Sequence, residues 1–155
     1  PKENNIMSFS MLLNLVETSN ADSKDLLWKF VKKYKTNLNE KEFPIFDKLV
    51  DYAIKYYKDV ISPNKKYKTP NSDEKKVLMS LVKALDECND KMTPEDIQTK
   101  IFSVGKENGY KDNLRDWFKL IYEVVFGDEN GPRIGFFISF FGVKETQNLI
   151  KEKIM

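Results

Sequence analysis

The sequence contains no histidine and only one cysteine, Cys88, among its 155 residues. Without histidine there is no His-based catalytic triad, no His-ligated metal and none of the commonest general base. One cysteine cannot form an internal disulfide, so we expect a reducing cytoplasm as the location. Cys88 continues the apolar series Leu78, Leu81 and Leu85, and we interpret it as a packing residue. These absences disfavour an independent enzyme, although carboxylate chemistry stays open.

Long apolar runs are also missing. The longest, Ile134–Val143, is about half of what a membrane-spanning helix needs, so we expect no contact with a membrane. The first residues, Pro1–Asn5, resemble neither a signal peptide nor a transit peptide. Because the chain begins without Met, we expect a fragment of a longer protein.

Arginine is scarce, since Arg115 and Arg133 are the only two among 26 basic residues. The net charge of +2 gives little indication of a polyanionic partner. Lysine abundance of this kind can reflect an AT-rich genome, so lysine clusters carry little weight. The two arginines carry more weight because they are rare.

What the sequence does contain is helical periodicity. Hydrophobic residues make up 41% of the chain and charged residues 32%, which is typical of a globular protein. Apolar residues recur at spacings of three and four, and no long segment alternates with a period of two. The sequence therefore predicts an all-α helical bundle of about seven to eight helices. We expect them near residues 8–18 and 27–34, over 44–61 and 73–89, from Pro94 to the ENGY sequence at 107–110, and over 112–126, 132–141 and 144–153.

Several helix ends are marked by their residues. Thr93 is predicted to cap the helix that Pro94 opens. Gly109 suits the left-handed conformation that ends this helix, and Gly127 ends the next.

The sequence SPNKKYKTPNS, residues 62–72, has two prolines and no periodicity, and predicts a boundary. We expect an N-terminal helical subdomain over 1–62, a linker over 63–72 and a C-terminal helical cage subdomain over 73–155. Lys65, Lys66 and Lys68 would form either a solvated linker, which we favour, or a strap that contacts phosphates.

The segment GDENGPRIGFFISFFGV, residues 127–143, is the most unusual in the chain. Gly131 permits a tight turn, Pro132 suits the first position of a helix, and Gly135 lets another backbone approach closely. Its four phenylalanines, Phe136, Phe137, Phe140 and Phe141, point in several directions around a helix. This pattern predicts a central helix surrounded by others.

Arg133 is then predicted in the first turn of a buried helix. Either it pairs with Asp128 or Glu129, or it presents a fork of donors suited to a phosphate or a base edge. The sequence leaves both interpretations open.

No catalytic motif is present. The sequence contains no phosphate-binding loop, nucleophile elbow or metal-ligand spacing, so we expect no catalytic residue and no metal. The neighbouring carboxylates Asp86 and Glu87 do not face one another on a helix.

The order of several segments resembles the C-terminal region of class I lysyl-tRNA synthetases. NLRDWFKLIYEVVFGDEN followed by GPRIGFFISFFGVKET is similar to a helix, a Gly-containing turn and a Gly-Pro-Arg-hydrophobic-Gly sequence in that family. Residues 8–34 resemble the start of the same region. FPIFDKLVDYAIKYY and TPEDIQTKIFSVGKENGY also follow in the expected order, so the resemblance covers most of the chain.

This resemblance implies an all-helical, cage-like anticodon-binding region, similar to that of glutamyl-tRNA synthetases. It implies a parent enzyme that joins lysine to its tRNA with ATP, and an upstream catalytic Rossmann domain in the same chain. The His-Ile-Gly-His and Lys-Met-Ser-Lys-Ser signatures of that domain are missing here. The fragment is therefore expected to bind the anticodon end of a lysine-accepting tRNA, with no cofactor of its own.

The candidate RNA-binding residues are Arg133, Arg115, Lys111 and Lys144. Lys111 and Arg115 are four positions apart near the start of a predicted helix, which would place them on one face. Lys144 opens the last helix. The alternatives are ordinary surface charges and, for the whole chain, a helical protein–protein interaction module without a nucleic-acid role.

Overall fold

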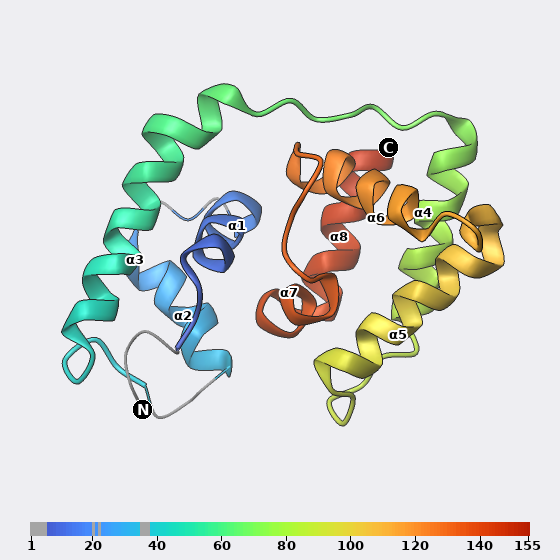
Figure 1. Ribbon diagram of the computed structural model, residues 1–155. Coiled ribbons are helices and arrows are strands. Elements are labelled where there is room, and N and C mark those ends of the chain that lie inside the picture. The colour runs from blue at the N-terminus through green and yellow to red at the C-terminus, as the bar shows by residue number, and fades with distance from the viewer. Residues whose placement is uncertain (1–5, 20, 22, 35–37) are drawn as a thin grey trace. The chain divides into compact units, whose positions relative to one another are not determined.

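The computed structural model describes residues 6–19, 21, 23–34 and 38–155. Within these ranges the chain has eight α-helices and no strand, which confirms the predicted all-α bundle (Figure 1). Three short π-helical turns continue helices α3, α5 and α6. The α-helices are α1 (Phe9–Ser19), α2 (Lys24–Tyr34), α3 (Pro44–Tyr56), α4 (Ser72–Leu85), α5 (Pro94–Gly105), α6 (Leu114–Ile121), α7 (Ile134–Phe141) and α8 (Val143–Ile154), and the short turns are η2 (Tyr57–Ile61), η3 (Ser62–Asn64), η4 (Lys106–Tyr110) and η5 (Tyr122–Phe126).

Helix α4 ends earlier than its apolar periodicity predicts, at Leu85 rather than near residue 89. The backbone N–H groups of Asp86, Glu87 and Cys88 bond to carbonyls three residues before them. Bonds of this spacing tighten the last turn and end the helix.

The chain forms two compact units, residues 1–65 and 66–155. Residues 65–71, between η3 and α4, carry no helix. In the second unit the amide of Lys68 donates to the Glu123 carbonyl at 3.0 Å, and its ammonium group pairs with Glu74 at 2.8 Å. In the first unit Lys65 pairs with Glu17 at 3.0 Å. Lys65 and Lys68 are thus each paired with a carboxylate, and Lys66 and Lys68 remain exposed to solvent.

The first unit packs α1, α2 and α3 around an apolar core. Trp28 meets the Phe46 ring edge-on, with centroids 5.3 Å apart. Val60 continues the apolar spacing of Phe46, Val50 and Ala53 in the sequence but is 46% exposed. It lies in the π-helical turn η2, where the wider turn moves residues out of the 3.6-residue register of α3. The core residues are Leu12, Leu15, Leu27, Trp28, Val31, Phe46, Val50 and Ala53.

Asp47 joins α2 to α3 in this unit. It accepts hydrogen bonds from the Lys24 ammonium group at 2.8 Å and from the Trp28 indole at 2.9 Å. The bond from Lys24, together with that from Trp28, outweighs desolvation and lowers the pKa of the Asp47 carboxyl.

A lowered folded-state pKa makes Asp47 stabilising above the unfolded carboxyl pKa of about 4, and this contribution is lost as the pH falls through the folded value. We expect Asp47→Asn to lower the free energy of unfolding at neutral pH, and the difference from wild type to shrink in acid. Urea unfolding followed by circular dichroism at several pH values measures this. Asp51→Asn, which removes only a surface pair with Lys55, is the control. An Asp47→Asn difference that stays constant with pH would contradict the linkage.

The second unit is built around α7, as predicted for a central helix. Its rings form what we call the phenylalanine hub: Phe126, Phe137 and Phe141. The Phe126 and Phe137 centroids are 5.0 Å apart and nearly perpendicular, and those of Phe137 and Phe141 are 5.3 Å apart. Phe140 is also buried, whereas Phe136 is half-buried.

Gly135 is where α7 meets α5, in agreement with the predicted close approach. A Cβ atom there would lie 2.8 Å from the Gln98 amide nitrogen and closer still to the Pro94 carbonyl oxygen. The amide of Gly135 donates to the buried Gln98 side-chain oxygen at 2.7 Å. Only glycine lets the two backbones come this close.

The start of α7 differs from the sequence-based expectation. The helix begins at Ile134, and Arg133 is its N-cap with an extended backbone, so Pro132 is not its first residue. The Pro132 carbonyl accepts a hydrogen bond from the Tyr122 hydroxyl at 2.9 Å. The first helical backbone bond runs instead from the Phe137 amide to the Arg133 carbonyl.

Other predicted helix ends are confirmed. Thr93 and Asp96 form a capping box, with Pro94 in the first turn of α5. Gly109 has φ +98° and Gly127 has φ +66°, which other residues adopt at a cost. None of the described helices combines the length and apolarity required to cross a bilayer.

Candidate nucleic-acid interface

The segment between α6 and α7, residues 127–133, is held against α6 by Tyr122. Gly131 lies on the tyrosine ring, where a Cβ atom would come within 2.6 Å of a ring carbon. The hydroxyl donates to the Pro132 carbonyl. Burial raises the pKa of Tyr122, so the hydroxyl keeps its proton at neutral pH and remains a donor. These two contacts fix the backbone directly before Arg133.

Arg133 is exposed at the N-terminal end of α7, and its guanidinium carbon lies 5.6 Å from the centroid of the Phe136 ring. This is a cation–π arrangement between a residue and the one three positions later. Among the described residues no carboxylate lies within ion-pair distance of Arg133. Of the two interpretations that the sequence leaves open, the pairing with Asp128 or Glu129 is therefore not observed, and Glu129 lies instead 3.8 Å from Lys119.

The N-terminal end of α7 suits an anion better than the N-terminal end of α5 does. The N-terminal end of a helix carries partial positive charge, and the first turn of α7 contains no acidic residue. The nearby start of α5 differs, because Glu95 and Asp96 occupy its first turn. An arginine stacked on a ring, with its donors directed to solvent, can contact a phosphate or the edge of a base.

Arg115 and Lys111 do not share a helical face, so that prediction is wrong. Arg115 is exposed in the first turn of α6, but Lys111 lies in the turn before it. Between them Asn113 has φ −148° and ψ 63°, which breaks the helical path. Its side-chain amide bonds to Asp116 and competes with a longer helix. Both cations are exposed, one before the start of α6 and the other within its first turn.

The structure places Arg133 and Arg115 at opposite ends of α5. The Trp117 indole in α6 donates to the Ile101 carbonyl at 3.0 Å and packs on Gly105, at the C-terminal end of α5. Arg133 precedes Gly135, which contacts Pro94 at the N-terminal end. Twelve residues of helix span about 18 Å, and Figure 1 shows α7 near the start of α5 and the beginning of α6 near its end.

Lys144 lies on a different helix from the two arginines, exposed in the first turn of α8. Gly142, with φ +114°, turns the chain from α7 into α8. The buried Gln147 then donates to the Val82 carbonyl at 2.8 Å and to the Asp86 carboxylate at 2.7 Å. This pair of bonds fixes the start of α8 on α4. The four predicted residues are thus spread over one unit rather than gathered in one cluster.

Two residues beside Arg133 were not found from the sequence: Phe136, whose ring its guanidinium covers, and Tyr122, which donates to the Pro132 carbonyl. The sequence predicts Phe136 only as one of four rings of a central helix, and it assigns no role to Tyr122. No sequence signal links Tyr122 to a carbonyl ten residues later. The spacing of three between Arg133 and Phe136 does indicate their contact, because residues so spaced are neighbours on a helix surface.

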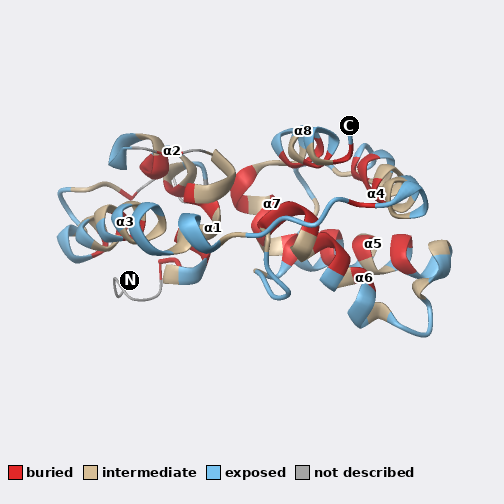
Figure 2. Ribbon diagram, turned by 90° about the horizontal axis from the view of Figure 1, so that it is seen from above, coloured by how far each residue is buried: buried red, intermediate tan, exposed pale blue. Residues whose placement is uncertain are grey.

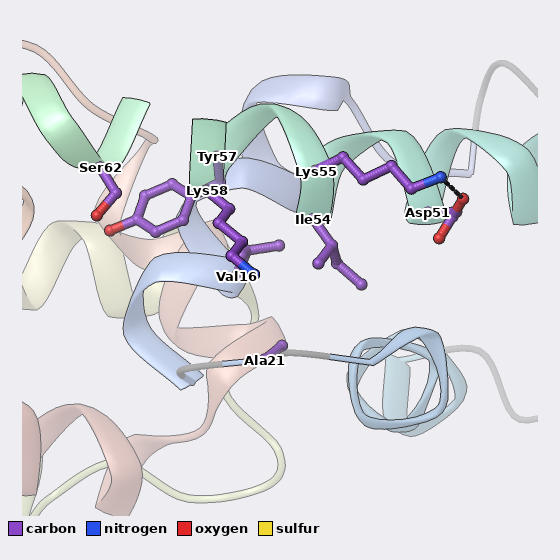
Figure 3. A pocket seen from close by; sticks show the side chains of 8 residues that line it. All are labelled: Val16, Ala21, Asp51, Ile54, Lys55, Tyr57, Lys58 and Ser62. Carbon is purple, nitrogen blue, oxygen red and sulfur yellow. Dashed lines mark ion pairs between the residues drawn. The ribbon is translucent and has the colours of Figure 1, made fainter. Parts of the chain in front are cut away.

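Other candidate sites are less developed. Cys88 is half-buried, and burial raises the pKa of its thiol, which disfavours the reactive thiolate. No group of three or more metal-ligating side chains occurs in the described ranges. The first unit has a hollow of about 440 Å³ beside α3, in which Lys58 extends across Val16 while Lys55 turns to Asp51 (Figure 3). The hollow is lined by Val16, Ala21, Asp51, Ile54, Lys55, Tyr57, Lys58 and Ser62.

Comparison with known proteins confirms the resemblance to lysyl-tRNA synthetases. The chain is 37% identical over 148 residues to a lysine–tRNA ligase of Rickettsia felis, and 36% identical over the same length to one of Rickettsia bellii. Each alignment covers 96% of this chain and 28% of the ligase. The chain thus corresponds to a part of these longer proteins. No family model matches it, and neither does any solved structure.

Proposed function

We propose that this chain is the tRNA anticodon-binding region of a class I lysine–tRNA ligase. The observation that carries the proposal is the similarity to lysine–tRNA ligases along nearly the whole chain. The proposed parent enzyme joins lysine to its tRNA with ATP in the cytoplasm. Its catalytic domain lies upstream in the same polypeptide, and this region contributes RNA binding without catalytic residues or a cofactor.

The proposed mechanism depends on how anticodon bases are read. These bases are unstacked, so a protein recognises them by stacking and by hydrogen bonds to their edges. Arg133 offers a planar fork of donors, held above Phe136 and fixed through Pro132 by Tyr122. Such preorganisation reduces the entropy lost when the contact forms. Arg133 is therefore assigned to a base edge or to the phosphate beside it.

The remaining cations are assigned to the backbone. Lys111 and Arg115 lie about one length of α5 from Arg133, and Lys144 lies at the start of α8. Contacts to phosphates position an RNA without reading its sequence, and they weaken as salt rises. Binding spread over several such contacts predicts a steep salt dependence, which a protein–protein module without an RNA partner would not show.

Arg133→Ala tests the proposal. Hydrogen bonds to a charged group contribute about 1.5–3 kcal/mol, so we expect a loss of about 10- to 100-fold in tRNA affinity with an unchanged fold. Filter binding of a lysine-accepting tRNA at two salt concentrations measures it. Arg115→Ala is the matched control, with a smaller loss and a salt slope lower by about one. Normal binding by Arg133→Ala together with reduced stability would assign the residue to the fold instead.

Tyr122→Phe extends the same test, because it removes the hydroxyl and keeps the ring on which Gly131 packs. If Tyr122 acts by positioning Arg133, this variant binds tRNA more weakly, and adding it to Arg133→Ala causes no further loss. Additive losses in the double variant would show that Tyr122 acts independently of the arginine.

A further inference from the structure

A cluster of three aromatic rings lies on the surface of the first unit. Phe9 comes from the first turn of α1, and Tyr52 and Tyr56 come from α3. The Phe9 centroid is 5.7 Å from that of Tyr52 and 5.8 Å from that of Tyr56, and the two tyrosine centroids are 6.0 Å apart. Tyr52 is 59% exposed, and the other two are half-buried. We propose that this cluster, the aromatic surface, stacks unpaired bases of single-stranded RNA.

The aromatic surface is not part of the hydrophobic core. One face of helix α3, formed by Phe46, Val50 and Ala53, is buried. Tyr52 and Tyr56 belong to the other face, because residues four positions apart lie on the same side of a helix. In Figure 2 exposed stretches run along α3 beside the buried ones. The rings therefore remain available for a ligand.

The geometry of the rings suits bases. Phe9 and Tyr56 are stacked at 15° to one another, and Tyr52 is tilted by about 40° to both. Every nucleobase has a π-face, so exposed rings bind single strands with little sequence preference. Within the described chain neither the Tyr52 hydroxyl nor the Tyr56 hydroxyl makes a hydrogen bond. These hydroxyls are free to bond to a base edge or a phosphate.

The charges beside the rings include a lysine that can contact a phosphate. Lys48 and Lys55 flank Tyr52 by one turn on either side, and both are exposed. Lys55 pairs with Asp51 at 3.1 Å, whereas Lys48 has no carboxylate within ion-pair distance in the described ranges. Two acidic residues lie beside the rings: Asp51, which pairs with Lys55, and Asp59, one turn beyond Tyr56. Because Asp51 neutralises Lys55, Lys48 is the cation that we assign to a phosphate next to a stacked base.

This inference goes beyond the proposed function, since Arg133, Arg115, Lys111 and Lys144 all belong to the second unit. It adds an RNA contact on the first unit, carried by aromatic side chains rather than by cations. The chemical class of the ligand is an unpaired nucleobase with its phosphate. Since the site lies on α1 and α3, it can be tested independently of Arg133.

The test compares Tyr52 variants of the whole chain by fluorescence anisotropy, with labelled oligouridine and with a lysine-accepting tRNA. Base stacking on an aromatic residue contributes about 1–3 kcal/mol, so Tyr52→Ala is expected to lower affinity about 5- to 100-fold. Tyr52→Phe, which keeps the ring, retains most of the affinity. Ile45→Ala is the matched control: Ile45 is 69% exposed on the same face of α3 and has no ring. Its affinity is expected to stay at the wild-type value.

Tryptophan fluorescence reports base stacking directly. In Tyr52→Trp the new indole is exposed, whereas the native Trp28 and Trp117 are 1% and 0% exposed. Oligouridine is expected to quench the emission of the variant and to leave the wild-type emission unchanged. Absence of quenching at concentrations that saturate binding would overturn the proposal.

The outcomes separate this inference from the proposed function. Wild-type affinity in Tyr52→Ala, together with weak binding by Arg133→Ala, overturns the aromatic surface and leaves the anticodon-binding role intact. Weak binding by Tyr52→Ala with normal binding by Arg133→Ala supports the aromatic surface alone. A dimer that dissociates in both Tyr52→Ala and Ile45→Ala, with unchanged RNA affinity, assigns the face to a second copy and overturns the inference.

Discussion

Gly135→Ala is expected to lower the free energy of unfolding by about 3 kcal/mol or more, at the upper end of what overpacking costs. The added methyl group would meet the backbone of α5 at Pro94 and Gln98, and backbone atoms cannot rotate away as a side chain can. The two helices would have to separate. Separation would also stretch the 2.7 Å hydrogen bond between the Gly135 amide and the buried Gln98 side chain.

Urea unfolding followed by circular dichroism measures this change. Gly109→Ala is the matched control, since Gly109 has φ +98° but no atom within 4 Å of its added Cβ. Gly109→Ala is expected to lower the free energy of unfolding by about 1–2 kcal/mol, because alanine disfavours this backbone conformation, without any steric clash. Equal losses in the two variants would show that the close approach of α5 and α7 contributes nothing beyond backbone conformation.

The second large effect is expected from Phe137→Ala. The ring is 1% exposed and lies between Phe126 and Phe141 in the phenylalanine hub. Truncating a buried phenylalanine costs about 3–5 kcal/mol, because it removes apolar contacts and leaves a cavity. We expect a variant that unfolds at a markedly lower urea concentration, and tRNA binding that is lost only where the protein is unfolded.

Phe136→Ala is the control for Phe137→Ala, one residue away on the other side of α7. Phe136 is half-buried and supports the Arg133 guanidinium. Its removal should cost much less stability and should weaken tRNA binding in the folded protein. If Phe136→Ala is as unstable as Phe137→Ala, and the folded variant binds tRNA with full affinity, then both rings belong to the core. That result would contradict the proposal that Phe136 supports Arg133.

These two residues show how the fold serves the proposed function. The phenylalanine hub fixes α7 against η5, Gly135 brings α7 onto α5, and the start of α7 presents Arg133. Base recognition requires donors in a defined place, since each donor that must first be ordered loses binding free energy. A rigid core beneath an exposed arginine satisfies that requirement.

Much of this architecture follows from local sequence alone. Helical periodicity determined the all-α bundle, and the Thr93–Asp96 capping box and the left-handed Gly109 and Gly127 mark three helix ends. The apolar residues around Gly135 indicated a central helix. These features depend on interactions within a few residues along the chain, which spacing and residue type record directly.

Tertiary contacts decided the rest. Pro132 stays outside α7 because its carbonyl bonds to Tyr122, and Arg133 lies over Phe136 instead of pairing with Asp128 or Glu129. Arg115 and Arg133, alike in the sequence, lie at opposite ends of α5. The aromatic surface likewise depends on α1 placing Phe9 beside α3. Partners distant in the chain meet only after the helices have packed, so no local pattern records which of them will touch.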